Sequence, residues 1–379
     1  MQEQSYQPDQ NLFVIPRREA PPKAFATDIL AAEMFSTLIG NDEVKDSLRR
    51  LLSGGRVPGS MLFTGEEGIG KKLFALELAK ALNCRQRIGV EACDECSSCK
   101  RISRSTFPPF TSEDDNKERM IWSEHADLAM VRPHKQIIRV KPMRELEREA
   151  NFRPFEGAAR IFIVEDADYM NDQAANALLK TLEEPPPASH LILTTSNPTA
   201  LLATIRSRCQ MIRFAPIDAA EVEKFLIEQK CFSDDDARLL ARTAQGSIGR
   251  ALAGDVETYR ERRETMLDVL RALALNHDRV ELLRSAEALA AAKDRHEYEQ
   301  RLDALEILIR DAWALALGRP SGTIVNGDLL VPLQQIAAGI KSEQAAAWLK
   351  QIEELRGTLE VNINRRIASD ALFLTMTGS

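Results

Sequence analysis

The sequence predicts an α/β fold in which a parallel sheet is wound with helices and followed by two purely helical units. Short apolar runs alternate with helical segments up to about residue 215, and such alternation is typical of a parallel sheet. Beyond Pro216 the strand signals fade. From about residue 255 to 377 the period and the propensities are helical. We therefore expect an N-terminal extension at 1–33, a sheet module at 34–215, a small helical lid at 216–254 and a helical terminus at 255–379.

The order of the elements follows from local composition. The extension is polar and contains prolines, and only 26–33 has helical character. Asn41 or Asp42 can cap a first helix that runs to Leu52. Buried strands are then expected at 60–64, 136–140, 159–164 and 191–195, and helices at 73–82, 143–150 and 171–184, the last of which is stopped by consecutive prolines.

Composition excludes several classes of protein. The 379 residues include 50 Lys and Arg against 57 Asp and Glu, which gives a formal net charge of −7. This balance argues against a protein that coats nucleic acid by bulk charge. No stretch approaches the roughly 18 consecutive apolar residues of a membrane span, and the opening segment lacks a secretory pattern. We expect a cytoplasmic protein without membrane contact.

A glycine-rich loop follows the first predicted strand. It has the frame G-x-x-x-x-G-K-[ST] of a phosphate-binding loop, but a second lysine replaces the hydroxyl, in the run Gly65-Glu66-Glu67-Gly68-Ile69-Gly70-Lys71-Lys72. In such a loop backbone N–H groups surround phosphate, and Lys71 would reach the β- and γ-phosphates of ATP. Lys72 removes an inner-sphere oxygen from Mg²⁺ and adds a positive charge. ATP binding therefore stays open, and Mg²⁺ binding and hydrolysis are expected to be impaired; the alternative is a turn without a ligand.

Further candidate nucleotide-site residues lie after the strands and in the lid. Glu165 and Asp166 follow the strand at 159–164 in the reverse of the usual Asp-Glu order, which affects the same magnesium-dependent step. Asn197, after the strand at 191–195, can orient water or simply cap the strand end. Arg250 opens a lid helix and can turn toward nucleotide or remain in solvent.

Four of the six cysteines are close together in the sequence. Cys84, Cys93, Cys96 and Cys99 have the spacing C-x8-C-x2-C-x2-C. Two short turns can present such thiolates to one tetrahedral ion, and four sulfur ligands leave no open position for substrate. We therefore expect a structural Zn²⁺ that orders a polar segment at 84–100. Free or redox-active thiols and an iron–sulfur cluster are the alternatives.

Arg208 is the candidate for chemistry outside the chain's own site. It follows a short predicted helix near the edge of the sheet module. The planar, permanently charged guanidinium of an arginine suits the phosphates of a neighbouring subunit, so Arg208 could act as an arginine finger in trans. In most proteins a solvated arginine would be the better interpretation.

Together these motifs resemble the delta-prime clamp-loader subunits of bacterial DNA polymerase III, within the AAA+ family. The resemblance covers nearly everything from Phe35 to Met376. Its most specific parts are the four-cysteine insert after the phosphate-loop helix, the run Asn176-Ala177-Leu178-Leu179-Lys180-Thr181-Leu182-Glu183-Glu184-Pro185-Pro186, the triplet Ser207-Arg208-Cys209 and the terminal Val361-Asn362-Ile363-Asn364.

The resemblance implies a role in a five-subunit ring that loads the sliding clamp on primed DNA. The fold would be an AAA+ nucleotide module with a zinc insertion, a lid and a C-terminal collar domain. Arg208 would complete the ATP site of the adjacent motor subunit, while Lys71, Glu165 and Asp166 would line a weakened site of the chain's own. The implied partners are the gamma/tau and delta subunits, the clamp and primer–template DNA, which the helix from Asn176 would help to face.

Two other functions are kept as alternatives. A catalytically active, gamma/tau-like ATPase subunit would require Mg²⁺ binding despite Lys72, and turnover with and without Lys72→Thr would reveal it. A stand-alone zinc-containing nucleic-acid binder would require tight, salt-dependent binding by the single chain, which the net negative charge does not favour.

Overall fold

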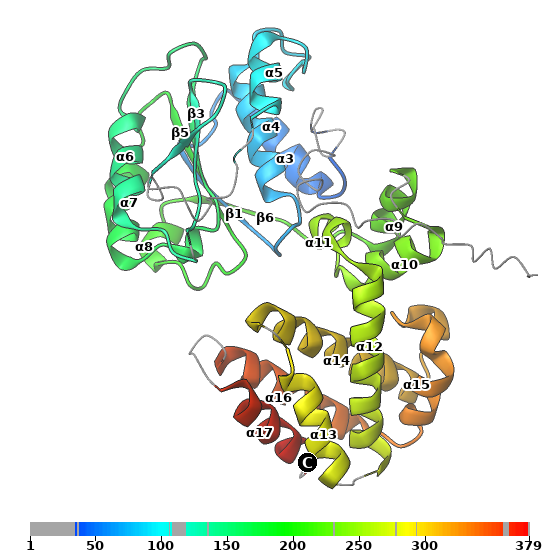
Figure 1. Cartoon of the computed structure of the whole chain (residues 1–379). Helices are drawn as coiled ribbons and strands as arrows, with labels where there is room; N and C mark the ends of the chain where they lie inside the picture. The colour runs from blue at the N-terminus through cyan, green and yellow to red at the C-terminus, as the bar shows by residue number, and fades with distance from the viewer. Residues whose placement is uncertain are drawn as a thin grey trace, which may run out of the picture.

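The computed structural model of the chain describes residues 35, 38–105, 107, 119–134, 136–229, 232–276, 279–292, 294–358 and 364–377 (Figure 1). The helix expected at 26–33 lies outside the described residues. So do most of the segment between Ser105 and Arg119, and residues 361–363 of the C-terminal motif.

Within the described residues the sheet has six strands in the order β2-β3-β4-β5-β1-β6. All neighbours are parallel except β2 and β3. The strands β1, β3, β4 and β5 are buried along their whole length, as expected for the centre of a parallel sheet. The bounds are β1 Ser60–Thr64, β2 Ile121–Trp122, β3 Leu128–Val131, β4 Arg160–Val164, β5 Ser189–Thr195 and β6 Gln210–Arg213.

Helices cover both faces of this sheet (Figure 1). Side chains alternate along β1, so that Met61 and Phe63 belong to the core of one face and Leu62 to the core of the other. The first face carries α3 Asp42–Ser53, α4 Lys71–Asn83 and α5 Ser97–Ser103, and the second carries α6 Val140–Ala150, α7 Asp172–Glu183 and α8 Ala203–Arg206.

The rest of the described chain is helical. Three short helices form the unit after β6, namely α9 Ala219–Glu228, α10 Asp234–Thr243 and α11 Ile248–Ala253. A separate core, with Tyr298 and Trp348 fully buried, is built from α12 Val256–Arg271, α13 Arg279–Ala290, α14 Arg295–Ala316, α15 Leu330–Ala337, α16 Ser342–Thr358 and α17 Arg365–Thr377. Among the described helices, none has both the length and the apolar composition needed to cross a membrane.

The strand predicted at 136–140 is wrong, and the strands β2, β3 and β6 were not predicted. Residues 136–140 make only isolated bridges, one of them between Ile138 and Met170, and Val140 already begins α6. Pro142 is tolerated there because the first helical turn needs no backbone donor. The sheet position belongs to β3, and β2 and β6 also lack a strong sequence signal. The side chain of Asn41 caps no helix; its amide group pairs with the backbone of Ala215 after β6.

Candidate functional site

The glycine-rich loop lies at the carboxyl end of β1, between that strand and α4. The backbone N–H of Gly65 donates to the carbonyl of Thr195 on β5 (3.3 Å), which places the loop beside the end of the neighbouring strand. Gly68 and Gly70 have φ angles of 71° and 101°, which favour glycine. The order of strand, glycine-rich loop and helix expected from the sequence is therefore present.

Lys71 is folded back onto the loop. Its Nζ donates to the carbonyls of Gly65 (2.6 Å) and Glu66 (2.7 Å). Burial lowers the pKa of Lys71, against the opposing charges of Asp166 and nearby glutamates. The ammonium group is thus held by backbone oxygens of its own loop.

Lys72 and Arg132 both form ion pairs with the carboxylate of Glu165, which directly follows β4. Lys72 Nζ lies 3.4 Å from Glu165 Oε1, and Arg132 Nε lies 2.5 Å from Glu165 Oε2. Burial lowers the pKa of Lys72, while Glu165 acts to raise it. Each oxygen of Glu165 therefore faces a protein cation.

Asp166 lies next to this cluster in an unusual backbone conformation. Its φ is 49°, in the left-handed region, and its N–H donates to Thr194 Oγ1 (3.2 Å). Burial, together with the charges of Glu165 and Asp168, raises the pKa of Asp166 to about 6. The folded protein consequently binds a proton at this side chain more tightly than the unfolded chain does.

Asp166→Asn is expected to stabilise the protein at high pH alone. Because the folded-state pKa is raised from 3.8 to about 6, wild-type stability falls as pH rises through this range. We expect a gain of roughly 1 kcal/mol at pH 8, after allowing for solvent screening of this partly exposed group, and almost none at pH 4. Asn also tolerates a positive φ. Urea unfolding at both pH values tests this, and an equal gain at both would contradict it.

The lid packs directly on the loop. The N–H of Gly249 donates to the carbonyl of Gly68 (2.9 Å), and a Cβ on Gly68 would lie 2.5 Å from Ser247 Oγ. Arg250 Nη2 lies 3.6 Å from Glu66 Oε2. The structure therefore brings Arg250 to the loop that carries Lys71, through an exposed ion pair.

Asn197 lies two residues beyond β5 and is exposed. Its N–H donates to Thr195 Oγ1 (3.0 Å), and its Oδ1 accepts from Thr199 (2.7 Å). Thr195 in turn donates to Asp168 Oδ1 (2.5 Å). These bonds fit the strand-end cap that was one of the two interpretations of Asn197.

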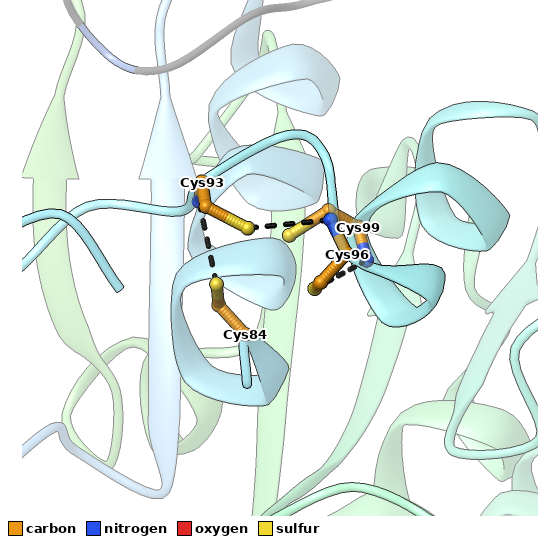
Figure 2. A group of neighbouring side chains, drawn as sticks. All are labelled: Cys84, Cys93, Cys96 and Cys99. Atoms are coloured by element: carbon orange, nitrogen blue, oxygen red, sulfur yellow. Dashed lines mark hydrogen bonds between the residues drawn. The ribbon is translucent and has the colours of Figure 1, made fainter. Parts of the chain in front are cut away.

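The four cysteines converge on one point (Figure 2). Their Sγ atoms all lie within 4.8 Å of one another, and sulfurs about 2.3 Å from one zinc ion would stand about 3.8 Å apart. Backbone N–H groups donate to three of these sulfurs, from Cys93 to Cys84 (3.3 Å), from Cys96 to Cys93 (3.3 Å) and from Cys99 to Cys96 (3.5 Å). Burial acts to raise the pKa of Cys96, but the N–H groups of Cys99 and Arg85 outweigh it and lower the pKa to about 6. The group fits a single metal ion.

Polar side chains connect this cysteine group to the segment before β4. Asp127 accepts the N–H groups of Phe155 (2.7 Å), Glu156 (2.9 Å) and Gly157 (2.8 Å). Asn83, which directly precedes Cys84, accepts those of Ala158 (2.9 Å) and Ala159 (3.0 Å). Five consecutive backbone donors are therefore satisfied by two side chains.

A histidine completes this connection. His125 Nε2 lies 2.9 Å from the Oγ of Ser98, the neighbour of Cys99, and His125 Nδ1 accepts the N–H of Asp127 (3.2 Å). His125 is completely buried, and burial lowers its pKa. Both ends of the cysteine segment are thus tied to residues 155–159, the amino-terminal approach to β4.

Arg208 lies away from the chain's own loop. It precedes β6 by two residues, and β6 runs parallel to β1 with Gln210 opposite Met61. Arg208 is therefore at the end where the strands begin. The loop follows the other end of β1: Gly65 lies four residues, or about 13 Å at 3.3 Å per residue, beyond the level of Gln210. Arg208 Nε donates to Glu183 Oε1 (2.7 Å), and Nη1 donates to the carbonyl of Thr204 (2.9 Å).

Comparison with known proteins decides the family. A family model described as DNA polymerase III, delta subunit, matches residues 40–218, and one described as its C terminal part matches residues 260–376. DNA polymerase III subunit delta' of Bacillus subtilis is 29% identical over 309 residues, 82% of this chain and 88% of its own length. DNA polymerase III subunit delta' of Escherichia coli is 28% identical over 322 residues, which are 84% of this chain and 89% of that protein. The chain belongs to the delta-prime family of DNA polymerase III clamp-loader subunits.

The delta-prime relationship also bears on the motor alternative. The Escherichia coli subunit tau is 30% identical over 226 residues, which is 58% of this chain and only 32% of tau. The delta-prime matches extend further, through most of both chains. A gamma/tau-like identity is therefore not favoured, and the expected wound, mostly parallel sheet with a helical C-terminal region is confirmed.

Sequence reasoning missed several residues of this delta-prime chain. Arg132 forms an ion pair with Glu165, and Glu183 accepts a hydrogen bond from Arg208, although nothing in the sequence links either pair. Asp127 and His125 were also missed. For Asn83 the sequence offered one indication of a role near the cysteine group, namely its position directly before the first of the four cysteines.

Proposed function

We propose that this chain is a delta-prime-like subunit of the DNA polymerase III clamp loader that helps to place the sliding clamp on primed DNA. The observation that carries this proposal is the match to delta-prime proteins across both the sheet module and the helical terminus. Its partners would be the gamma/tau and delta subunits, the clamp and primer–template DNA, in a cytoplasmic replication complex.

Arg208 would act in that complex as an arginine finger for the ATP of an adjacent motor subunit. Its position at the opposite end of the strands from the chain's own phosphate loop supports a role in trans. A guanidinium there would stabilise the charge that develops on the transferred phosphoryl group.

The chain's own nucleotide site would be degraded. Glycines and Lys71 retain a cradle for phosphates, but Lys72 and Arg132 together neutralise Glu165, and the cradle lacks a hydroxyl for Mg²⁺. The residues thus suit a nucleotide's phosphates better than the Mg²⁺ ion on which hydrolysis depends.

Lys72→Thr tests this account of the site. The isolated wild-type chain should show no ATP turnover above background. The variant should bind ADP more tightly with Mg²⁺ than without it, yet should still fail to hydrolyse ATP, because Arg132 continues to hold Glu165. Titration calorimetry and a phosphate-release assay measure the two quantities. Turnover by the wild-type chain would contradict the proposal.

The four cysteines would hold a structural Zn²⁺. Sulfur ligands suit zinc, and a complete set of four leaves no open position for water or substrate. When bound, the ion would fix the segment between α4 and α5, and Cys84, Cys93, Cys96 and Cys99 would each supply one thiolate.

Reconstitution tests the proposed function as a whole. A clamp loader assembled with this chain should load a sliding clamp onto primed DNA, and omission of the chain should abolish both assembly of the ring and loading. Clamp transfer to a primed circular template is the measurement. A complex that loads clamps equally well without the chain would refute the proposed role.

A further inference from the structure

Glu183 holds the guanidinium of Arg208 from one side. Its Oε1 accepts from Nε (2.7 Å), and Nη2 forms an ion pair with the same oxygen. The carbonyl of Thr204 accepts from Nη1 (2.9 Å). A guanidinium has five N–H donors. Glu183 thus engages the Nε/Nη2 edge and Thr204 engages Nη1, which leaves two of the five donors without a partner among the described residues.

The acceptors stand on well-anchored elements. Leu182, the residue before Glu183 on α7, and Ile205, the residue after Thr204 on α8, are both buried in the core of this face of the sheet. Pro185, just after α7, lies so close to Gly59 that a Cβ added at Gly59 would be only 2.4 Å from its ring. The chain leaving α7 therefore packs against the start of β1. The backbone positions that carry the Glu183 carboxylate and the Thr204 carbonyl are therefore anchored relative to each other.

Local helix energetics do not explain a glutamate at this place. Glu183 is the last residue of α7, where the helix dipole disfavours a negative charge. The Glu183 side chain is 48% exposed and that of Arg208 is 32% exposed, and ion pairs with this exposure add little to stability. What the pair does provide is a defined orientation for a long side chain that would otherwise be mobile.

We propose that Glu183 is a positioning residue for Arg208, which orients the guanidinium so that its two unbonded N–H groups face a neighbouring subunit's nucleotide. This inference rests on the proposed role of Arg208 in trans. Preorganisation of a charged group lowers the entropy and reorganisation costs of reaching the transition state, so the effect belongs to the chemical step.

The test uses the complete clamp loader with clamp and primed DNA. Glu183→Gln keeps the shape of the side chain and removes its charge, and it should lower kcat for ATP about tenfold while KM stays within twofold. Glu184→Gln is the matched control, because it removes the adjacent exposed glutamate, which forms no ion pair in the described structure. Size-exclusion chromatography establishes that each variant assembles.

A double-mutant cycle separates this inference from the proposed function. In an Arg208→Ala background, Glu183→Gln should have no further effect, because Glu183 acts through Arg208. If Arg208→Ala leaves turnover unchanged, the proposed role of Arg208 fails. If Arg208→Ala is strongly defective but Glu183→Gln matches wild type, or raises kcat, the positioning role alone is overturned. An equal loss from Glu183→Gln in both backgrounds would also overturn it.

Discussion

Arg208→Ala is expected to reduce ATP turnover at the site that this subunit faces by about a thousandfold or more, the range typical of an arginine finger. The loss should appear in the assembled clamp loader with clamp and primed DNA, while the isolated chain should be unaffected in any assay. The physical reason is that a permanently charged, planar donor set would be missing from the developing charge on the phosphoryl group. Phosphate release under single-turnover conditions is the direct measurement.

The control for this experiment is another exposed arginine of the same module. Arg213→Ala removes the same charge from β6, and its side chain makes a contact only with Met211 among the hydrogen bonds of the described residues. It should leave turnover close to wild type. Unchanged turnover in Arg208→Ala, with assembly intact, would remove the finger role and leave a subunit whose contribution is architectural.

Local sequence signals were sufficient where one segment forms one element. The glycines after β1 and the apolar run of β4 each predicted what the structure contains, and the helix expected at 171–184 is α7. Residues 136–140 gave a wrong strand prediction because a short apolar run also suits a bridged turn, here with Ile138 paired to Met170. β3, with only four residues, is defined by its neighbour β4, which no local pattern reveals.

The sequence named several residues of the candidate site but did not reveal which side chains form ion pairs with one another. Lys72 led to the prediction of an impaired magnesium site, but its ion pair with Glu165 and the second cation from Arg132 could not be predicted, because they depend on three separate elements meeting. The same holds for Glu183, the last residue of α7, and Arg208, which lies in the turn between α8 and β6. Charge pairs between distant segments leave no periodic or spacing signal in a single sequence.

Removal of the metal is expected to release the backbone before β4, some distance from the cysteines themselves. Helix α5 has only seven residues, too few to be stable alone in water. Without a metal it should lose its position, and Ser98 would no longer meet His125. Asp127 and Asn83 would then hold the N–H groups of residues 155–159 less firmly. Loss of about 2 kcal/mol from such bonds corresponds to roughly 30-fold faster amide exchange.

Hydrogen exchange on Cys99→Ser and on chelated wild-type protein measures this effect. Cys209→Ser is the matched control, because Cys209 is also buried but lies outside the group of four cysteines, and burial raises the pKa of its thiol to about 12. Trp122 gives a second readout, since the guanidinium of Arg160 lies 5.0 Å from its ring and 5.2 Å from the ring of Phe155. Fluorescence from Trp122 should change together with exchange at residues 155–159. Complete loss of metal with unchanged exchange at these amides would show that the cysteine segment and the approach to β4 are independent, and that Asp127 and Asn83 suffice to order it.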